Sequence, residues 1–241
     1  MELYAYVTCI TELTIEDATV VALDSYTESN FGPVLSSNSP GMLLGCAYQL
    51  FQLVPLVSDF WKRQRHSRLP LEKPPIDNND WYRSLKEYSA LHSQISSWEP
   101  PPDATLDFAN GGRLYQEALL AYLELSNSGA ADLEIVKNRT DAAMALLYNI
   151  AGNAPIAVTL CWPLSLFASI TINLSYRETI RQRFQQMYHD LGFGNMLTII
   201  EYLDRLWDEK QMTTTLQKEY PAQSTSLHSL TRKHQLEISF L

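Results

Sequence analysis

The 35 residues from Ala142 to Tyr176 contain no Asp, Glu, Lys, Arg or His. A stretch of this length and character is kept away from water, either by lipid or by the rest of the protein. Its segment Ala154–Asn173 has the twenty residues that one bilayer span needs. The stretch therefore allows two interpretations, a membrane helix or the core of a globular protein.

Polar residues inside the uncharged stretch distinguish the two interpretations. Asn153, Thr159 and Ser165 each cost free energy in hydrocarbon unless they find a partner, and Pro163 interrupts the segment. A second, shorter apolar stretch, Met42–Ser58, also lacks a strong aromatic belt at both ends. Both stretches favour buried helices of a globular protein, and a helical membrane protein stays as an alternative.

Composition points to one globular domain. The chain has 241 residues, is 46% hydrophobic and 19% charged, and contains no long Gly- or Ser-rich linker. Its formal net charge is -9 at pH 7. Because phosphate neutralisation supplies most of the affinity for nucleic acid, a chain this acidic is not expected to bind DNA directly.

Helical periodicity dominates the rest of the sequence. Between Asn79 and Trp98, large apolar residues recur every three or four positions and form one stripe, namely Trp81, Leu85, Tyr88, Leu91, Ile95 and Trp98. We expect a cap at Asp77–Asn79 and a stop before Pro100. Similar patterns predict helices over 104–126 (with Gly111-Gly112 as a weak spot), 133–151, 175–191 and 195–210.

The two ends of the chain are less regular. Residues 4–23 have a helical spacing of apolar side chains, and their Thr and Val content leaves a strand open. Residues 41–66 are mostly apolar, and Pro55 is expected to kink or split the helix there. Residues 213–241 predict a loose tail after a helical domain spanning 1–212. The expected fold class is all-α, a multi-helix bundle of roughly seven to nine helices.

One acidic motif raises the question of catalysis. Asp77-Asn78-Asn79-Asp80 resembles the aspartate-rich motif with which all-α prenyl-diphosphate enzymes hold magnesium. The same residues precede a helix, where Asp and Asn cap free N–H groups, and no second metal motif follows. We therefore expect no enzyme, no catalytic residue, no metal site and no cofactor, with an all-α prenyl-diphosphate-type enzyme as the alternative.

Neither the histidines nor the cysteines form a ligand set. The five histidines are scattered, at His66, His92, His189, His228 and His234. The three cysteines, Cys9, Cys46 and Cys161, stand far apart among apolar neighbours. They predict buried thiols in a reducing compartment, and the N-terminus lacks the basic region of a secretory signal.

The one dense basic run is Lys62–Arg68, with the sequence KRQRHSR. Three interpretations are open: a nuclear import signal, a phosphate-binding patch, or the solvated C-terminal end of a helix. Lys and Arg at a helix C-terminus complement the helix dipole, which favours the third interpretation.

Four segments together resemble the fungal-specific transcription factor domain, the regulatory region of fungal zinc-cluster transcription factors. They are LLGCAYQLFQLVPLVSDF (43–60), LHSQISSWEPPPD (91–103), GRLYQEALLAYLELS (112–126) and, most specifically, the block at 160–210. That block begins LCWPLSLFASITINLSYRETIRQRF, continues through a Gly-rich turn, and closes with EYLDRLWDEK. The resemblance covers about residues 43–210.

The resemblance implies a nuclear regulator of transcription, often of metabolic or secondary-metabolite genes. It implies contacts with protein partners of the transcription machinery or with a DNA-binding subunit, or with a small apolar ligand. Full-length members of the family carry a six-cysteine, two-zinc module that contacts DNA. That module is not expected within this chain, which has three cysteines in all.

The resemblance also sets expectations for individual residues. Trp162 and Trp207 are expected to be large core residues. Arg177, Arg181 and Arg183 are expected to face solvent or to pair with carboxylates. At Ala168 and Ile170 the family commonly has Gly and Glu, so a polar contact of the family at this point is in doubt.

Overall fold

A computed structural model of the chain describes Ile10 and residues 47–66, 78–127, 133–192 and 194–216. Within these residues there are seven α-helices, one 3-10 helix and no strand, which confirms the all-α prediction. The elements are α3 (Tyr48–His66), α4 (Asn78–Ser96), α5 (Leu106–Asn127), α6 (Leu133–Tyr148), η2 (Pro155–Leu160), α7 (Cys161–Ile170), α8 (Leu174–Leu191) and α9 (Asn195–Leu216).

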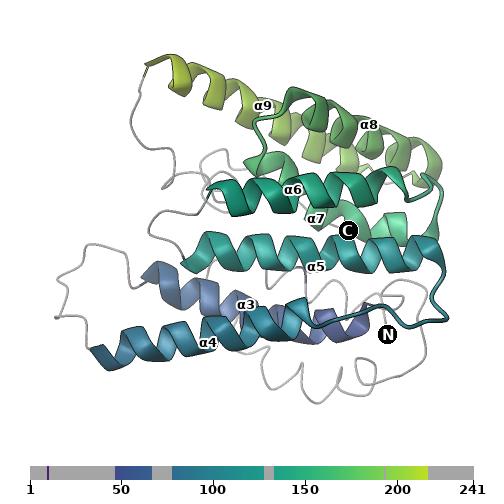
Figure 1. Cartoon of the computed structure of the whole chain (residues 1–241). Coiled ribbons are helices and arrows are strands. Elements are labelled where there is room, and N and C mark those ends of the chain that lie inside the picture. Colours follow the sequence, from purple (N-terminus) through teal and green to yellow (C-terminus); the bar gives the residue numbers. More distant parts are fainter. Residues whose placement is uncertain (1–9, 11–46, 67–77, 128–132, 193, 217–241) are drawn as a thin grey trace.

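Helix α5 lies at the centre of the described bundle. It contacts α3 and α4 on one side and α6 on the other, and it also packs on η2 and α7 (Figure 1). Helices α8 and α9 lie side by side and cover α7. The short helix α7 is therefore enclosed by α5, α8 and α9.

Helix α7 is the middle of the uncharged stretch, and it is buried on every side. All its residues from Cys161 to Ser169 are buried. Pro163 lies in its first turn, where a missing N–H costs nothing because that group has no helical partner. The hydroxyls of Thr159, Ser165 and Ser169 donate to carbonyls one turn earlier, at 2.7 to 2.9 Å. These three hydroxyls thus find partners within the stretch, and α7 forms part of the core.

The membrane alternative receives no support from the described helices. None of them combines the length and the apolar character that crossing a bilayer requires.

Five rings from three helices form the aromatic row, which comprises Phe51, Tyr115, Trp162, Tyr122 and Trp61. Trp162 of α7 stacks on Tyr115 with centroids 6.2 Å apart and meets Tyr122 edge-on at 6.0 Å. Beyond them Phe51 lies 4.8 Å from Tyr115, and Trp61 stacks on Tyr122 at 5.7 Å. The Tyr115 hydroxyl donates to the carbonyl of Thr159. These contacts join α3, α5 and α7.

Of the two outcomes expected at Pro55, a kinked or a split helix, the split is wrong, and so is the weak spot expected at Gly111-Gly112. Pro55 does not split its segment, since α3 runs through it as one helix with Val54 and Val57 buried on either side. Gly111-Gly112 is a close-packing point rather than a weak spot. A Cβ on Gly111 would come within 2.4 Å of Ile156, and one on Gly112 within 2.4 Å of Trp98. Glycine allows η2 and the end of the α4 segment to approach α5.

The predicted boundaries hold within a few residues for α4, α5, α6 and α8. Gly192 ends α8 in the left-handed conformation, with φ of 72°, as expected of a glycine C-cap. Helix α9 continues to Leu216, beyond the predicted end at Lys210 and beyond the proposed domain boundary at residue 212. Residues 4–23, apart from Ile10, and residues 217–241 lie outside the described part, so the tail stays a prediction.

Candidate functional site

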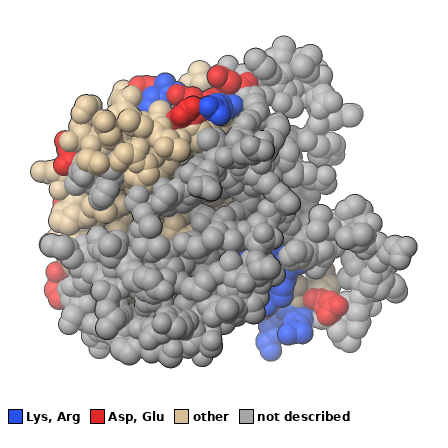
Figure 2. All heavy atoms as spheres, turned by 180° about the vertical axis from the view of Figure 1, so that it is seen from behind, with Lys and Arg blue, Asp and Glu red and all other residues tan. Residues whose placement is uncertain are grey.

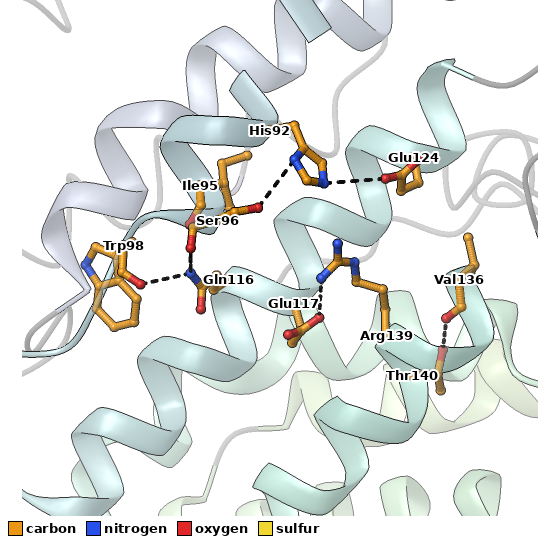
Figure 3. Close-up of polar contacts among 10 residues, drawn as sticks. All are labelled: His92, Ile95, Ser96, Trp98, Gln116, Glu117, Glu124, Val136, Arg139 and Thr140. Carbon is orange, nitrogen blue, oxygen red and sulfur yellow. Dashed lines mark hydrogen bonds and ion pairs between the residues drawn. The ribbon is translucent and has the colours of Figure 1, made fainter. Parts of the chain in front are cut away.

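Polar side chains join α4, α5 and α6 (Figure 3). The Gln116 amide of α5 donates to the carbonyls of Ile95 at 2.7 Å and Trp98 at 2.9 Å. Ile95 lies in the last turn of α4, where its carbonyl also accepts the Trp98 N–H at 3.2 Å, and Trp98 lies two residues beyond the helix end. Gln116 therefore caps one helix from the face of another.

Farther along the same interface, charged groups pair across the helices. Arg139 of α6 and Glu117 of α5 lie 3.1 Å apart, and His92 of α4 lies 3.8 Å from Glu124 of α5 (Figure 3). Burial, together with the hydrogen bond and charge of Glu124, raises the pKa of Tyr88. Each of these groups faces a neighbouring helix, so we assign them to helix pairing.

Arginines and a tryptophan join α7, α8 and α9. The Trp207 Nε1 of α9 donates to the carbonyl of Ala168 at 2.9 Å, so a polar contact exists at Ala168 through its backbone. The guanidinium carbons of Arg177 and Arg181 each lie 5.3 Å from the centroid of the Trp207 ring. Trp162 and Trp207 are both buried, as predicted.

The expectation for the three arginines is right only for Arg181, which pairs with Asp204. Arg177 is buried, and its Nε donates to the Thr171 carbonyl at 3.1 Å. Arg183 donates to the carbonyls of Leu147 and Ile150 at 3.1 and 2.8 Å. Burial lowers the pKa of both Arg177 and Arg183. They are drawn inward because the ends of α6 and α7 offer carbonyls that need donors.

A hollow of about 460 Å³, open to solvent, is lined in part by Arg177, Arg181 and Trp207. Its lining residues are Leu174, Arg177, Glu178, Arg181, Asp204, Trp207 and Asp208. Two cations and three carboxylates line it, so its chemistry does not match a small apolar ligand.

The apolar stripe of α4 is only half buried. Leu91, Ile95 and Trp98 are buried, whereas Trp81 is 55% and Leu85 41% exposed. Tyr82, which follows Trp81 and is not part of the stripe, is 64% exposed. Trp81 and Tyr82 meet edge-on, with centroids 5.0 Å apart. In Figure 1 the first turns of α4 reach beyond the C-terminal end of α5, so α5 cannot cover them. We call Trp81, Tyr82 and Leu85 the α4 face.

The described part of the basic run lies at the end of α3, against α4. Lys62 and Arg63 are in the last turns of α3, which ends at His66, as the helix-end interpretation expects. Arg63 pairs with Glu87 of α4, and Gln64 donates to Ser84. The end of α3 therefore lies against the beginning of α4, and Arg68 lies outside the described residues.

The acidic motif lies at the start of α4. The helix begins at Asn78, and Asp80 is exposed in its first turn, where a carboxylate complements the helix dipole. Asp77 lies outside the described residues. Among the residues that the structure describes, no three His, Cys, Asp or Glu side chains are grouped to hold a metal ion.

The block at 160–210 folds into three helices: α7 with Trp162-Pro163-Leu164, α8 with its arginines, and α9 with Trp207. This block carries the most specific part of the resemblance to the fungal-specific transcription factor domain. Comparison with known families establishes membership. The family described as "Fungal specific transcription factor domain" matches residues 1–240, and the chain belongs to this family. It is a family of transcription factor domains and not of enzymes, which sets the prenyl-diphosphate alternative aside. No curated protein and no solved structure matches the chain.

Sequence reasoning missed Gln116, Arg183 and the exposure of the α4 face. For Gln116 a signal existed, because it stands one turn from Gly112 and from Leu120 on an otherwise apolar face of α5. For Arg183 no local signal existed, since its partners lie more than thirty positions earlier.

Proposed function

We propose that this transcription factor domain acts in the nucleus by binding a partner protein through the α4 face. The observation that carries the proposal is the exposed aromatic pair Trp81 and Tyr82 beside Leu85. Large aromatic side chains contribute most of the binding free energy at protein interfaces, and their exposure costs free energy when no partner is bound.

A partner protein accounts for the described residues better than a small apolar ligand does. The interior aromatic side chains contact one another in the aromatic row, and the hollow above Trp207 is lined by charged groups. Direct DNA binding by this chain is not part of the proposal, because its net charge of -9 opposes phosphate contacts. The partner is then a component of the transcription machinery or a DNA-binding subunit, and by resemblance the targets are metabolic or secondary-metabolite genes.

A reporter experiment tests the proposal. The full chain is fused to an unrelated DNA-binding module, and reporter expression is compared with that of the module alone. Replacing Trp81, Tyr82 and Leu85 together by alanine should abolish most of the difference, while the thermal unfolding midpoint stays close to that of the parent chain. The matched control replaces two exposed residues of other helices, Leu106→Ala and Tyr148→Ala.

Two results would contradict the proposal. In one, the triple substitution leaves reporter expression unchanged. In the other, the chain alone shifts the mobility of promoter DNA at physiological salt, which would mean that it contacts DNA itself.

A further inference from the structure

Two cations border the α4 face. Lys86 lies four residues after Tyr82 and therefore one turn along the same side of the helix. Arg83 follows Tyr82 directly and lies about 100° farther around the helix, next to Lys86. Both side chains are exposed, and neither has an ion pair within the residues that the structure describes. The apolar surface is thus edged by positive charge that is available to a ligand.

The end of α3, which contacts α4 through Arg63 and Glu87, carries Lys62 and Arg63. Figure 2, which views the molecule from behind, shows blue atoms gathered at the lower right, on the side where α3 ends and α4 begins. Three carboxylates share these turns: Asp59, Asp80 and Glu87. Glu87 is already paired with Arg63, and Asp80 lies at the very start of α4. Asp80 directly precedes Trp81, so the exposed charges nearest the aromatic pair are the two cations Arg83 and Lys86 and this one carboxylate, with a positive balance.

Local charge outweighs net charge for a ligand in contact with this surface. Charges separated by more than about 8 Å are largely screened at physiological ionic strength. A segment lying on Trp81 and Tyr82 consequently interacts with Arg83 and Lys86 far more than with the distant carboxylates that make the chain acidic.

We infer that the α4 face, with Arg83 and Lys86, binds an acidic segment of a partner protein in which Asp or Glu side chains stand beside large apolar ones. The inference rests on the proposed function, since it specifies the chemistry of the partner for that same surface. The apolar side chains of the segment cover Trp81, Tyr82 and Leu85. Its carboxylates pair with the two cations, which fixes the orientation of the segment.

A single-stranded nucleic acid is the competing ligand class, because aromatic rings and cations also accept stacked bases and phosphates. Affinity for nucleic acid, however, grows with the number of phosphates neutralised, and two unpaired cations neutralise few. The described surface therefore favours carboxylates accompanied by apolar side chains.

The test measures binding of fluorescent probes to the full chain by anisotropy. The probes are three peptides of equal length with the same Phe and Leu residues, their remaining positions being Asp and Glu, Asn and Gln, or Lys, and a single-stranded DNA of the same length. We expect the acidic peptide to bind with a dissociation constant in the range of tens of micromolar, about tenfold tighter than the neutral peptide.

A charge reversal sharpens the test. The double variant Arg83→Glu, Lys86→Glu should lose about tenfold in affinity for the acidic peptide and should gain affinity for the lysine peptide. The control variant Lys137→Glu, Arg205→Glu changes the net charge equally, at exposed positions of α6 and α9, and should leave both affinities unchanged.

Each contrary outcome overturns the inference. It falls if no peptide binds, if the neutral peptide binds as tightly as the acidic one, if the DNA binds most tightly, or if the control variant has the same effect as the charge reversal. The proposed function is judged separately. If Trp81→Ala weakens all peptides equally while the charge reversal has no effect, the α4 face still binds partners and only the acidic chemistry is wrong.

Discussion

The two sides of helix α7 are held by different kinds of contact. Toward α3 and α5, Trp162 packs in the aromatic row, where neutral rings touch rings. Toward α8 and α9, Arg177 and Trp207 donate hydrogen bonds to carbonyls near the end of α7. The stability of the first side depends on how well the rings fill the space between the helices. The stability of the second side depends on hydrogen bonds to carbonyls that the helix end leaves without a helical donor.

The difference explains how an uncharged helix can have arginines as neighbours. A guanidinium can lie in a mostly buried place when carbonyl oxygens and an aromatic face replace water. Arg183 likewise donates hydrogen bonds to carbonyls at the end of α6. Basic side chains of α8 thus serve as structural donors, and the comparison predicts distinct costs for removing each kind of contact.

The largest effect is expected for Trp162→Ala. The side chain is fully buried between two tyrosines, so its removal leaves a cavity in the aromatic row. We expect a loss of about 3–5 kcal/mol in the free energy of unfolding, measured by urea denaturation. Leu106→Ala, at an exposed position of α5, is the control and should change it by less than about 0.5 kcal/mol. A loss of unfolding free energy no larger than that of the control would mean that the aromatic row contributes little to the stability of the core.

An intermediate effect is expected for Arg183→Met, which keeps much of the length of the side chain and removes the donors. The carbonyls of Leu147 and Ile150 then lose their charged partner, and the expected loss is about 1.5–3 kcal/mol. Arg205→Met, which breaks an exposed pair with Glu201, should cost at most about 0.5 kcal/mol. Equal urea midpoints for the two variants would show that Arg183 contributes no more to stability than the exposed Arg205.

The smallest effect is pH-dependent and concerns Cys161, the first residue of α7, whose sulfur lies 3.7 Å from the sulfur of Met196 of α9. Burial raises the pKa of this thiol to about 12. The folded state therefore keeps its proton while the unfolded state releases it above about pH 8.5, so stability falls as pH rises from there toward 12.

At about pH 9.5 this linkage should cost the parent chain about 1 kcal/mol relative to pH 7.5. The comparison is the change in unfolding free energy between the two pH values, measured for the parent chain and for Cys161→Ala. The variant should lose less, because the other ionisable groups are the same in both chains. Identical pH dependence in the two chains would show that the thiol is not buried as described.

Much of the fold could be predicted because periodicity is a local property. The uncharged stretch identified α7 as buried, and the glycine after Leu191 marked the end of α8. The prediction that the residues of the α4 stripe form a helix is also correct. The pattern could not predict that Trp81 and Leu85 remain exposed, because their burial depends on where α5 ends relative to α4.

The candidate site was less predictable for the same reason. The basic run 62–68 and the stripe at 81–98 were separate observations in the sequence, and the packing of α3 on α4 brings them together through Arg63 and Glu87. Gln116 could be noticed as a polar residue on an apolar face of α5, but its partners in the α4 segment could not be predicted. Arg183 acts on carbonyls more than thirty positions earlier, so no local pattern marks it.

The sequence by itself determined which segments become helices and that the stretch around Trp162 lies inside, because helix periodicity and the absence of charge are properties of neighbouring residues. Only the tertiary structure decided that Arg177 and Arg183 turn inward and that the first turns of α4 present aromatic side chains to solvent. Helix-end carbonyls acquire partners, and apolar faces acquire cover, only when the helices are placed against one another in space.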